Sequence, residues 1–258
     1  MSQITTELVK QLRDSTGVSV MQCRKALEEA QGDMEKAIVI LKKSSSDIAL
    51  KKAGRDAKDG AVMVKTNGNK AVLLALNCET DFVAKNEDFT NLLSTLTEKA
   101  LTEGVEAMKA GSKEMIDQII QKTGENIQLG DSIEVTGSVI GNYVHNGKTA
   151  VIVSLEGGNA DLAKDIAMHV AAMRPEYLDP KEITEESRKT VAEIFEKEVM
   201  ALDKPEDIKK KMLEGKIATY FKEKTLTEQN FIKNPDETIA SLLSKAGAKI
   251  IEIKRYSI

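Results

Sequence analysis

Cysteine, histidine and aromatic residues are all scarce in this chain. Its 258 residues include two cysteines, two histidines, five phenylalanines, four tyrosines and no tryptophan. Cys23 and Cys78 lie outside any CxxC spacing, and His145 and His169 belong to no HExxH motif. The cysteines are therefore interpreted as ordinary thiols in a reducing compartment. No metal site, cofactor site or catalytic nucleophile is expected.

Long apolar runs and a strong charge imbalance are also lacking. No apolar run approaches the roughly 20 residues that a membrane span needs, and the start, MSQITTELVK, has no secretory hydrophobic core. The net charge is −4, which gives no general attraction for a polyanion. We therefore expect a cytoplasmic protein without a membrane or direct nucleic-acid partner. The 41% of apolar residues allows a real core, and the length predicts one larger domain with smaller modules.

Three short amphipathic patterns occupy residues 1–45 and predict a three-helix module. Ser19 and Gln22 form a capping box, and Asp33 is expected to cap the third helix. A bundle of this size is marginal alone and is typical of a docking module. The polar and locally basic residues 46–59 predict a linker, helical in part.

An internal repeat organises the next part of the chain. TNGNKAVLLAL, residues 66–76, resembles HNGKTAVIVSL, residues 145–155, at an offset of 79. In each copy an Asn-Gly pair separates two β-rich runs, which predicts a type I′ hairpin, and an amphipathic helix follows. The pattern predicts an α+β fold whose core is two pseudo-repeated sheet-plus-helix subdomains. Their expected bounds are 60–136 for the first, and 137–180 with 225–258 for the second.

Residues 181–224 interrupt the second subdomain and predict an inserted antiparallel helical hairpin. Eleven basic and eleven acidic residues interleave there along a narrow apolar seam. Two interpretations stay open: an interaction arm, including one through which two copies form a homodimer, and an ordinary packed helix pair. Farther on, Asn234, Pro235 and Glu237 are expected to start a helix that Gly247 stops, before a last strand.

GNYVHNGKT, residues 141–149, ends like the phosphate-binding loop of nucleotide hydrolases. Five residues separate Gly141 from Gly147 where that motif has four, and a strand is expected next in place of a helix. A hairpin turn is therefore the better account. His169 lies on the inward stripe of a predicted helix, so we expect a satisfied core or interface histidine. His145, beside the turn, is expected to be an exposed loop residue.

The segment NCETDFVAKNEDF, residues 77–89, follows a predicted buried strand. Thr80 or Asp81 can cap a short helix there, and Phe82 then has two interpretations. The ring packs back onto the sheet, or it points outward with Asp81 as an interface anchor. The second repeat has GGNAD at this place and no aromatic residue. Phe82 is therefore not demanded by the shared architecture, which favours the interface.

Long blocks of the sequence, in order, resemble the bacterial translation elongation factor Ts family. They are LVKQLRDSTGVSVMQCRKALEEAQGDMEKAI (8–38), KKAGRDAKDG (51–60), NCETDFVAKN (77–86), GENI (124–127) and IAMHVAAMRPEY (166–177). The resemblance implies a guanine nucleotide exchange factor for the GTPase elongation factor Tu, and no enzyme in the usual sense. It also implies a ubiquitin-associated-like N-terminal module, two pseudo-repeated subdomains and a helical hairpin.

The same resemblance implies which residues meet the GTPase. The aromatic ring of the central segment inserts between helices of the GTPase and, with its neighbouring carboxylate, shifts the elements that hold Mg²⁺ and the phosphate loop. That segment is Thr80, Asp81, Phe82 and Val83. The residues through which the N-terminal module docks are Arg13, Val20 and Met21. The residues that make secondary contacts are Thr123, Gly124 and His145.

Two departures from the family pattern matter. Longer members continue into a C-terminal helix that contacts the GTPase, whereas this sequence ends at Ile258, so we expect that contact to be absent. Asp165 and Lys233 stand where related sequences can carry other residue types.

Two other classes of function fit the sequence less well. An RNA- or tRNA-associated protein would use the basic linker and the helical arm, but a basic face, stacking aromatics and an RNA motif are lacking. A small-molecule enzyme would need a constellation of catalytic residues that the sequence does not show.

Overall fold

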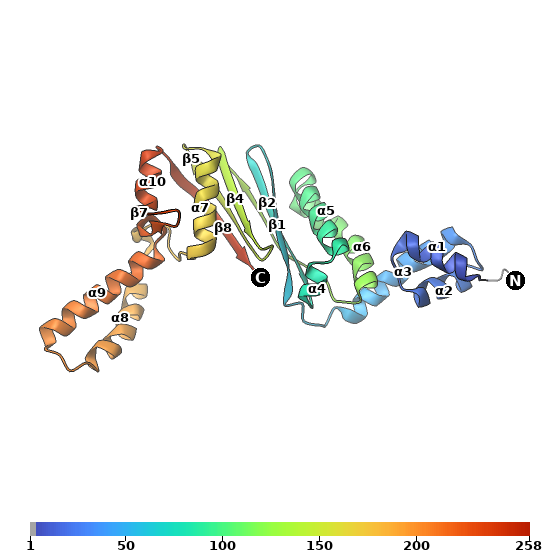
Figure 1. The fold of residues 1–258 in the computed structure, drawn as a ribbon, viewed down its shortest axis with the longest axis horizontal. Helices are drawn as coiled ribbons and strands as arrows, with labels where there is room; N and C mark the ends of the chain where they lie inside the picture. Colours follow the sequence, from blue (N-terminus) through green and yellow to red (C-terminus); the bar gives the residue numbers. More distant parts are fainter. Residues whose placement is uncertain (1–3) are drawn as a thin grey trace. The chain divides into compact units, whose positions relative to one another are not determined.

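A computed structural model describes residues 4–258, so the first three residues of the expected docking module lie outside the described part. The chain divides into two units. The first contains the chain up to Val135 with Val144–Ala150 and Tyr256–Ile258, and the second contains Thr136–Tyr143 and Val151–Arg255. Helices and small sheets occur together along the described chain (Figure 1). The predicted α+β class is confirmed.

The first unit begins with three helices, α1 (Thr6–Thr16), α2 (Val20–Glu29) and α3 (Met34–Lys52). Each starts after a residue whose side chain accepts a hydrogen bond from a backbone N–H three residues on, namely Thr5, Ser19 and Asp33. The caps predicted at Ser19 and Asp33 are confirmed. The three helices enclose a core of their own, formed by Val9, Leu12, Val18, Cys23, Ala26, Leu27, Ala30, Ala37 and Leu41.

Helix α3 extends beyond this small core. It continues through residues 46–52, so the expected linker is helical over its first half. Ala49 is buried and belongs to the core of the following subdomain. One continuous helix therefore joins the two cores.

Strands β1 (Asp59–Asn67) and β2 (Lys70–Cys78) pair antiparallel along their whole lengths. Asn67 pairs with Lys70, so the turn consists of Gly68 and Asn69. Gly68 has a φ of 59°, and Asn69 is not among the described non-glycine residues with positive φ. This φ pattern is that of a type II′ turn, so the type I′ prediction is wrong for the first hairpin. The pairing places the glycine first among the two central residues, where type II′ requires it.

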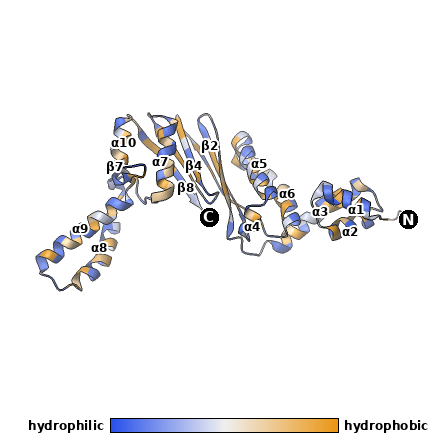
Figure 2. Ribbon diagram, viewed as in Figure 1, coloured by the Kyte–Doolittle hydropathy of each residue, from blue (hydrophilic) through white to orange (hydrophobic). Residues whose placement is uncertain are grey.

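Three helices of the first unit follow β2 in the chain. A single turn, α4 (Asp81–Ala84), precedes α5 (Glu87–Glu103), which packs on β1 and β2, and α6 (Val105–Thr123) packs on α5. Strand β3 (Gln128–Thr136) completes a sheet of order β1-β2-β3. Figure 2 shows apolar residues along β2. The core beneath contains Val72, Leu74, Leu76, Cys78, Phe89, Leu92, Leu93, Leu96, Met108, Ile116 and Ile120.

A second sheet has the order β4-β5-β8, formed by β4 (Val139–His145), β5 (Thr149–Glu156) and β8 (Lys249–Ser257). In the turn between β4 and β5, Asn146 and Gly147 have φ values of 51° and 66°. The backbone N–H of Lys148 donates to the carbonyl of His145 at 2.9 Å. Two successive left-handed residues fit a type I′ turn, so this prediction is confirmed for the second hairpin.

Helix α7 (Ala160–Met173) packs on β5 through a core that includes Val153 and Ile166. Gly141 of β4 lies so near this helix that a Cβ would sit 2.2 Å from the backbone nitrogen of Lys164. The glycine that begins the phosphate-loop-like stretch thus permits close helix packing. A turn and a strand follow it, which confirms the hairpin account.

Residues 181–224 form two packed helices, α8 (Glu185–Met200) and α9 (Glu206–Lys224), as the pattern predicted. Val191, Val199 and Phe221 are buried. Ile194 and Ile208 of the predicted seam are 56% and 45% exposed, so the helix pair covers only part of its apolar residues.

The last elements correct one prediction. They are the 3₁₀ turns η1 (Pro180–Glu182) and η2 (Leu226–Glu228), strands β6 (Asn230–Phe231) and β7 (Asn234–Thr238), and helix α10 (Ile239–Lys245). Asn234 and Pro235 lie in a strand that pairs only with β6, an edge position that tolerates proline. The helix begins later because Thr238 is its cap and accepts from the N–H of Ser241 at 3.2 Å.

Candidate partner-binding site

The central segment folds into the single turn α4 at the end of β2. Thr80 caps this turn, because its hydroxyl accepts from the N–H of Val83 at 3.4 Å. Ala84 is buried and Val83 packs against the first-subdomain core. Phe82 points the other way and is 83% exposed, more than any other large apolar side chain among residues 4–258. The structure thus selects the outward interpretation of the ring.

Asp81, the first residue of α4, has a basic neighbour on the next turn. The Lys85 ammonium donates to its carboxylate at 2.7 Å, and this bond raises the pKa of Lys85. Both side chains are substantially exposed. An exposed pair of this kind contributes little to stability, so Asp81 can exchange Lys85 for another cation or donor at small cost.

A carboxylate that sequence reasoning missed holds the start of this turn. Glu125 accepts from the N–H groups of Glu79 and Thr80 at 3.1 and 3.0 Å, and from the Thr80 hydroxyl at 2.6 Å. It directly follows Thr123 and Gly124. The structure therefore brings these two expected contact residues next to Thr80, although more than 40 positions separate them in the sequence. The only sequence signal was the GENI block.

The expected docking residues lie on α1 and α2. Arg13 is exposed on α1, and Val20 and Met21, at the start of α2, are 50% and 74% exposed. The buried face of α2 is formed by Cys23, Ala26 and Leu27, so Val20 and Met21 lie outside it. Exposed apolar side chains and an exposed arginine are both typical of an interface.

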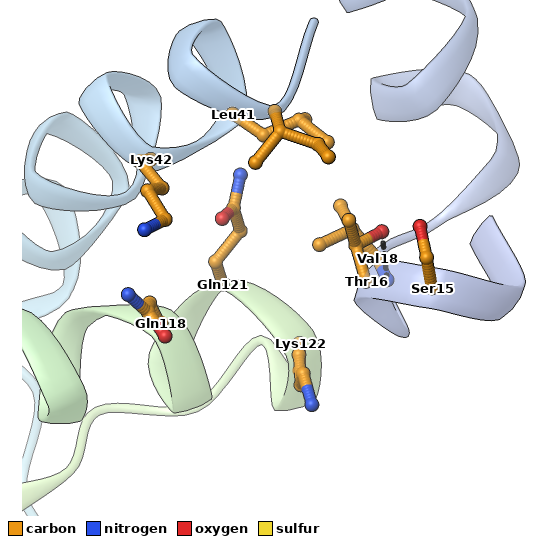
Figure 3. Close-up of a pocket in the computed structure, with 9 residues that line it drawn as sticks. Ser15, Thr16, Val18, Leu41, Lys42, Gln118, Gln121 and Lys122 are labelled. Atoms are coloured by element: carbon orange, nitrogen blue, oxygen red, sulfur yellow. Dashed lines mark hydrogen bonds between the residues drawn. The ribbon is translucent and has the colours of Figure 1, made fainter. Parts of the chain in front are cut away.

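Buried polar contacts fix α6 against the N-terminal helices. The amide of Gln121 donates to the Gln22 side chain at 3.1 Å and to Ser44 at 3.0 Å, and Ser46 donates to Asp117 at 2.7 Å. Figure 3 shows Gln121 rising from α6 toward α3. The cavity at this joint has about 260 Å³. Its lining residues are Ser15, Thr16, Val18, Ile38, Leu41, Lys42, Gln118, Gln121 and Lys122.

His145, the remaining expected contact, ends β4 and is exposed. Its ring nitrogen Nε2 lies 3.3 Å from the amide nitrogen of Asn146. The turn that follows is held on β1, since the Val62 N–H donates to the Gly147 carbonyl at 2.8 Å. All ten expected contact residues therefore lie in the first unit.

In the second unit, His169, Asp165 and Lys233 all have polar partners. His169 is fully buried, with Nε2 2.9 Å from the side-chain oxygen of Gln229 and Nδ1 accepting from the N–H of Ile232 at 3.2 Å. It is the satisfied histidine that was expected. Asp165 and Lys233, which stand where related sequences can carry other residue types, form an ion pair at 2.6 Å.

Comparison with known proteins tests the resemblance directly. The family model described as Elongation factor TS matches residues 79–258, well over half of the chain. The chain belongs to the elongation factor Ts family. Elongation factor Ts of Hahella chejuensis is 40% identical over all of this chain and 93% of its own length. The namesakes from Aeromonas salmonicida and Pseudomonas fluorescens are 41% and 39% identical, each over all of this chain and 92% of their own lengths.

The family match and the site overlap. The matched region begins at Glu79, one residue before the cap of α4, and the relatives extend the similarity through the N-terminal helices. No helix among residues 4–258 is long and apolar enough to cross a membrane. Together, the family model and the relatives cover the whole of the described chain.

Proposed function

We propose that this protein is a guanine nucleotide exchange factor for elongation factor Tu, working in the cytoplasm during translation elongation. The observation that carries the proposal is the outward ring of Phe82, beside an accessible carboxylate, on a capped turn at the end of a buried strand. Membership of the elongation factor Ts family supports the choice of partner.

The proposed mechanism acts on the magnesium site of the GTPase. Phe82 inserts between helices of the partner, and Asp81 helps to shift the elements that hold Mg²⁺ and the phosphate loop. Mg²⁺ demands near-ideal octahedral geometry, and the diphosphate depends on the metal and on loop amides together. A small displacement of either element therefore weakens the binding of both Mg²⁺ and the diphosphate, and GDP leaves.

Exchange of this kind is a coupling between two binding events, without covalent chemistry. A factor that prefers the empty GTPase weakens the binding of GDP by a certain free energy. Bound GDP weakens the binding of the factor by the same free energy. A coupling of ~4 kcal/mol changes affinity about a thousandfold. The factor needs no preference for GTP over GDP, because the more abundant nucleotide binds the emptied site.

The other expected contacts add affinity and orientation in this proposal. Arg13, Val20 and Met21 dock the N-terminal helices on the nucleotide-binding domain of the partner. Thr123 and Gly124, next to Thr80, and His145 make secondary contacts. A homodimer through α8 and α9 also remains a proposal, supported by the exposed apolar side chains on those helices.

Release of a fluorescent GDP from elongation factor Tu, followed by stopped flow, tests the function. With this protein in excess, the release rate is expected to rise with its concentration to a plateau far above the spontaneous rate. An exchange factor gives this result only with its GTPase present, and turnover of a small molecule by the purified protein alone is not expected. A release rate that stays at the spontaneous value would refute the proposal.

A further inference from the structure

At the base of α4, the carboxylates of Glu79 and Glu125 each accept hydrogen bonds from the backbone of the other segment. Glu125 accepts from the backbone of Glu79 and Thr80, and the Glu79 carboxylate in turn accepts from the N–H of Asn126 at 2.7 Å. Both carboxylates are partly shielded from solvent. Charge-assisted bonds of this kind are stronger than neutral ones, and a reciprocal pair fixes both segments relative to each other.

The bond to Glu125 sets the direction of the Thr80 hydroxyl, which caps α4. The Thr80 hydroxyl has one proton, and it points to Glu125 at 2.6 Å. The oxygen lone pairs are then free to accept from Val83 at 3.4 Å. A turn of four residues cannot maintain itself, because helix nucleation is unfavourable. Besides the burial of Ala84 and the packing of Val83, the bonds of Glu125 thus hold the turn that contains Phe82.

The same loop is bound to the end of α3. Lys52 donates to the carbonyl of Gly124, and the Asn126 amide donates to the carbonyl of Arg55 at 2.6 Å. The Arg55 guanidinium also reaches Glu79 at 3.4 Å. Helix α3 begins in the N-terminal core, and the bonds at its end connect it through residues 124–126 to Thr80.

We propose that Glu125 is a positioning residue for nucleotide exchange, which holds the Phe82 ring in the direction that enters the partner. This inference rests on the proposed function. Glu125 acts through Thr80, without touching the nucleotide. Its loss is expected to impair the step at which the ring displaces the magnesium site, more than the initial docking through Arg13, Val20 and Met21.

The test compares Glu125→Gln and Glu125→Ala with the control Glu106→Gln, an exposed glutamate on α6 whose side chain pairs with Lys109. In the stopped-flow GDP assay, Glu125→Ala is expected to lower the plateau rate about tenfold, with less than about a twofold change in the half-saturating concentration. Glu125→Gln keeps one acceptor oxygen and is expected to fall between. The control should match the wild type.

Hydrogen exchange on the free protein provides a second measurement. The amides of Glu79, Thr80 and Val83 should lose protection in Glu125→Ala, while the amides of α5 keep theirs. This measurement needs no GTPase, so it still decides whether Glu125 orders α4 if the wild type fails to release GDP. An unchanged plateau rate overturns the proposal, whether or not protection is lost. So does an increase in half-saturating concentration as large as the fall in plateau rate, because that indicates general loss of binding.

Discussion

Phe82 occupies a position that folding alone does not explain. Phe89, Phe221 and Phe231 are between 0% and 6% exposed, and Phe195 packs edge-on against a tyrosine ring. Burying a phenylalanine stabilises a protein by about 1.5–3 kcal/mol, a gain that the exposed ring forgoes in the free chain. A partner that covers the ring recovers it. The exposed ring thus adds little to the stability of the free protein and is consistent with a binding role.

His169 makes the stability of the second unit depend on pH. Burial lowers the pKa of the ring below its ordinary value of 6.5, and the bond to Gln229 only partly offsets this. Between the folded pKa and 6.5, the unfolded chain binds more protons than the folded chain. The contribution of His169 to stability is therefore fully present above about pH 6.5 and declines as the pH falls below it.

Denaturant unfolding between about pH 7.5 and 5.5 measures this effect. The free energy of unfolding should decrease toward the lower pH, and His169→Gln should show a smaller decrease. The difference between the two slopes gives the contribution of His169. Carboxylates with lowered pKa values, such as Asp33, Asp59 and Glu237, act at lower pH. Equal slopes for His169→Gln and the wild type would contradict this account.

At the scale of elements, local signals in the sequence predicted the helices better than the turns. The caps at Ser19 and Asp33 were predictable because a side chain and a backbone N–H three residues apart decide them. The first hairpin turn depends on the strand register, which an Asn-Gly pair does not fix alone. The prediction of a helix that starts at Asn234 was wrong, because pairing with β6 outweighs the local start signal there.

Two glycines should respond in opposite ways to alanine. Gly141→Ala places a Cβ against the backbone of α7, which cannot move aside, and is expected to cost about 1–3 kcal/mol or more. Gly111→Ala, in the exposed interior of α6, meets no atom within 4 Å and should stabilise by about 0.5–1 kcal/mol. Urea denaturation measures both. Destabilisation by Gly111→Ala, or a neutral Gly141→Ala, would show that the packing is described wrongly.

For the whole molecule, the sequence predicted the residue types of the candidate site better than their arrangement. The resemblance supplied Thr80 to Val83, but the residue pattern left the direction of Phe82 open until burial decided it. Glu125 was missed because its partners lie about 45 residues away, a separation at which no local pattern can register a contact. Arg13 and His145 were named by resemblance alone, and their roles remain proposals.

The residues proposed for docking and for displacement lie on different elements of the first unit. The N-terminal helices carry Arg13, Val20 and Met21, and α4 carries Asp81 and Phe82, with α3 and α6 joining them. Docking and displacement are thus assigned to different residues. Arg13→Ala should raise the half-saturating concentration and leave the plateau rate near that of the wild type.

The most direct test is the plateau rate of GDP release from elongation factor Tu with Phe82→Ala at saturating concentration. The ring is proposed to act mainly while the magnesium site is displaced, so its loss should lower this rate about tenfold or more, while the unfolding free energy changes by less than about 0.5 kcal/mol. A Phe82→Ala plateau rate equal to that of the wild type would contradict the proposed mechanism.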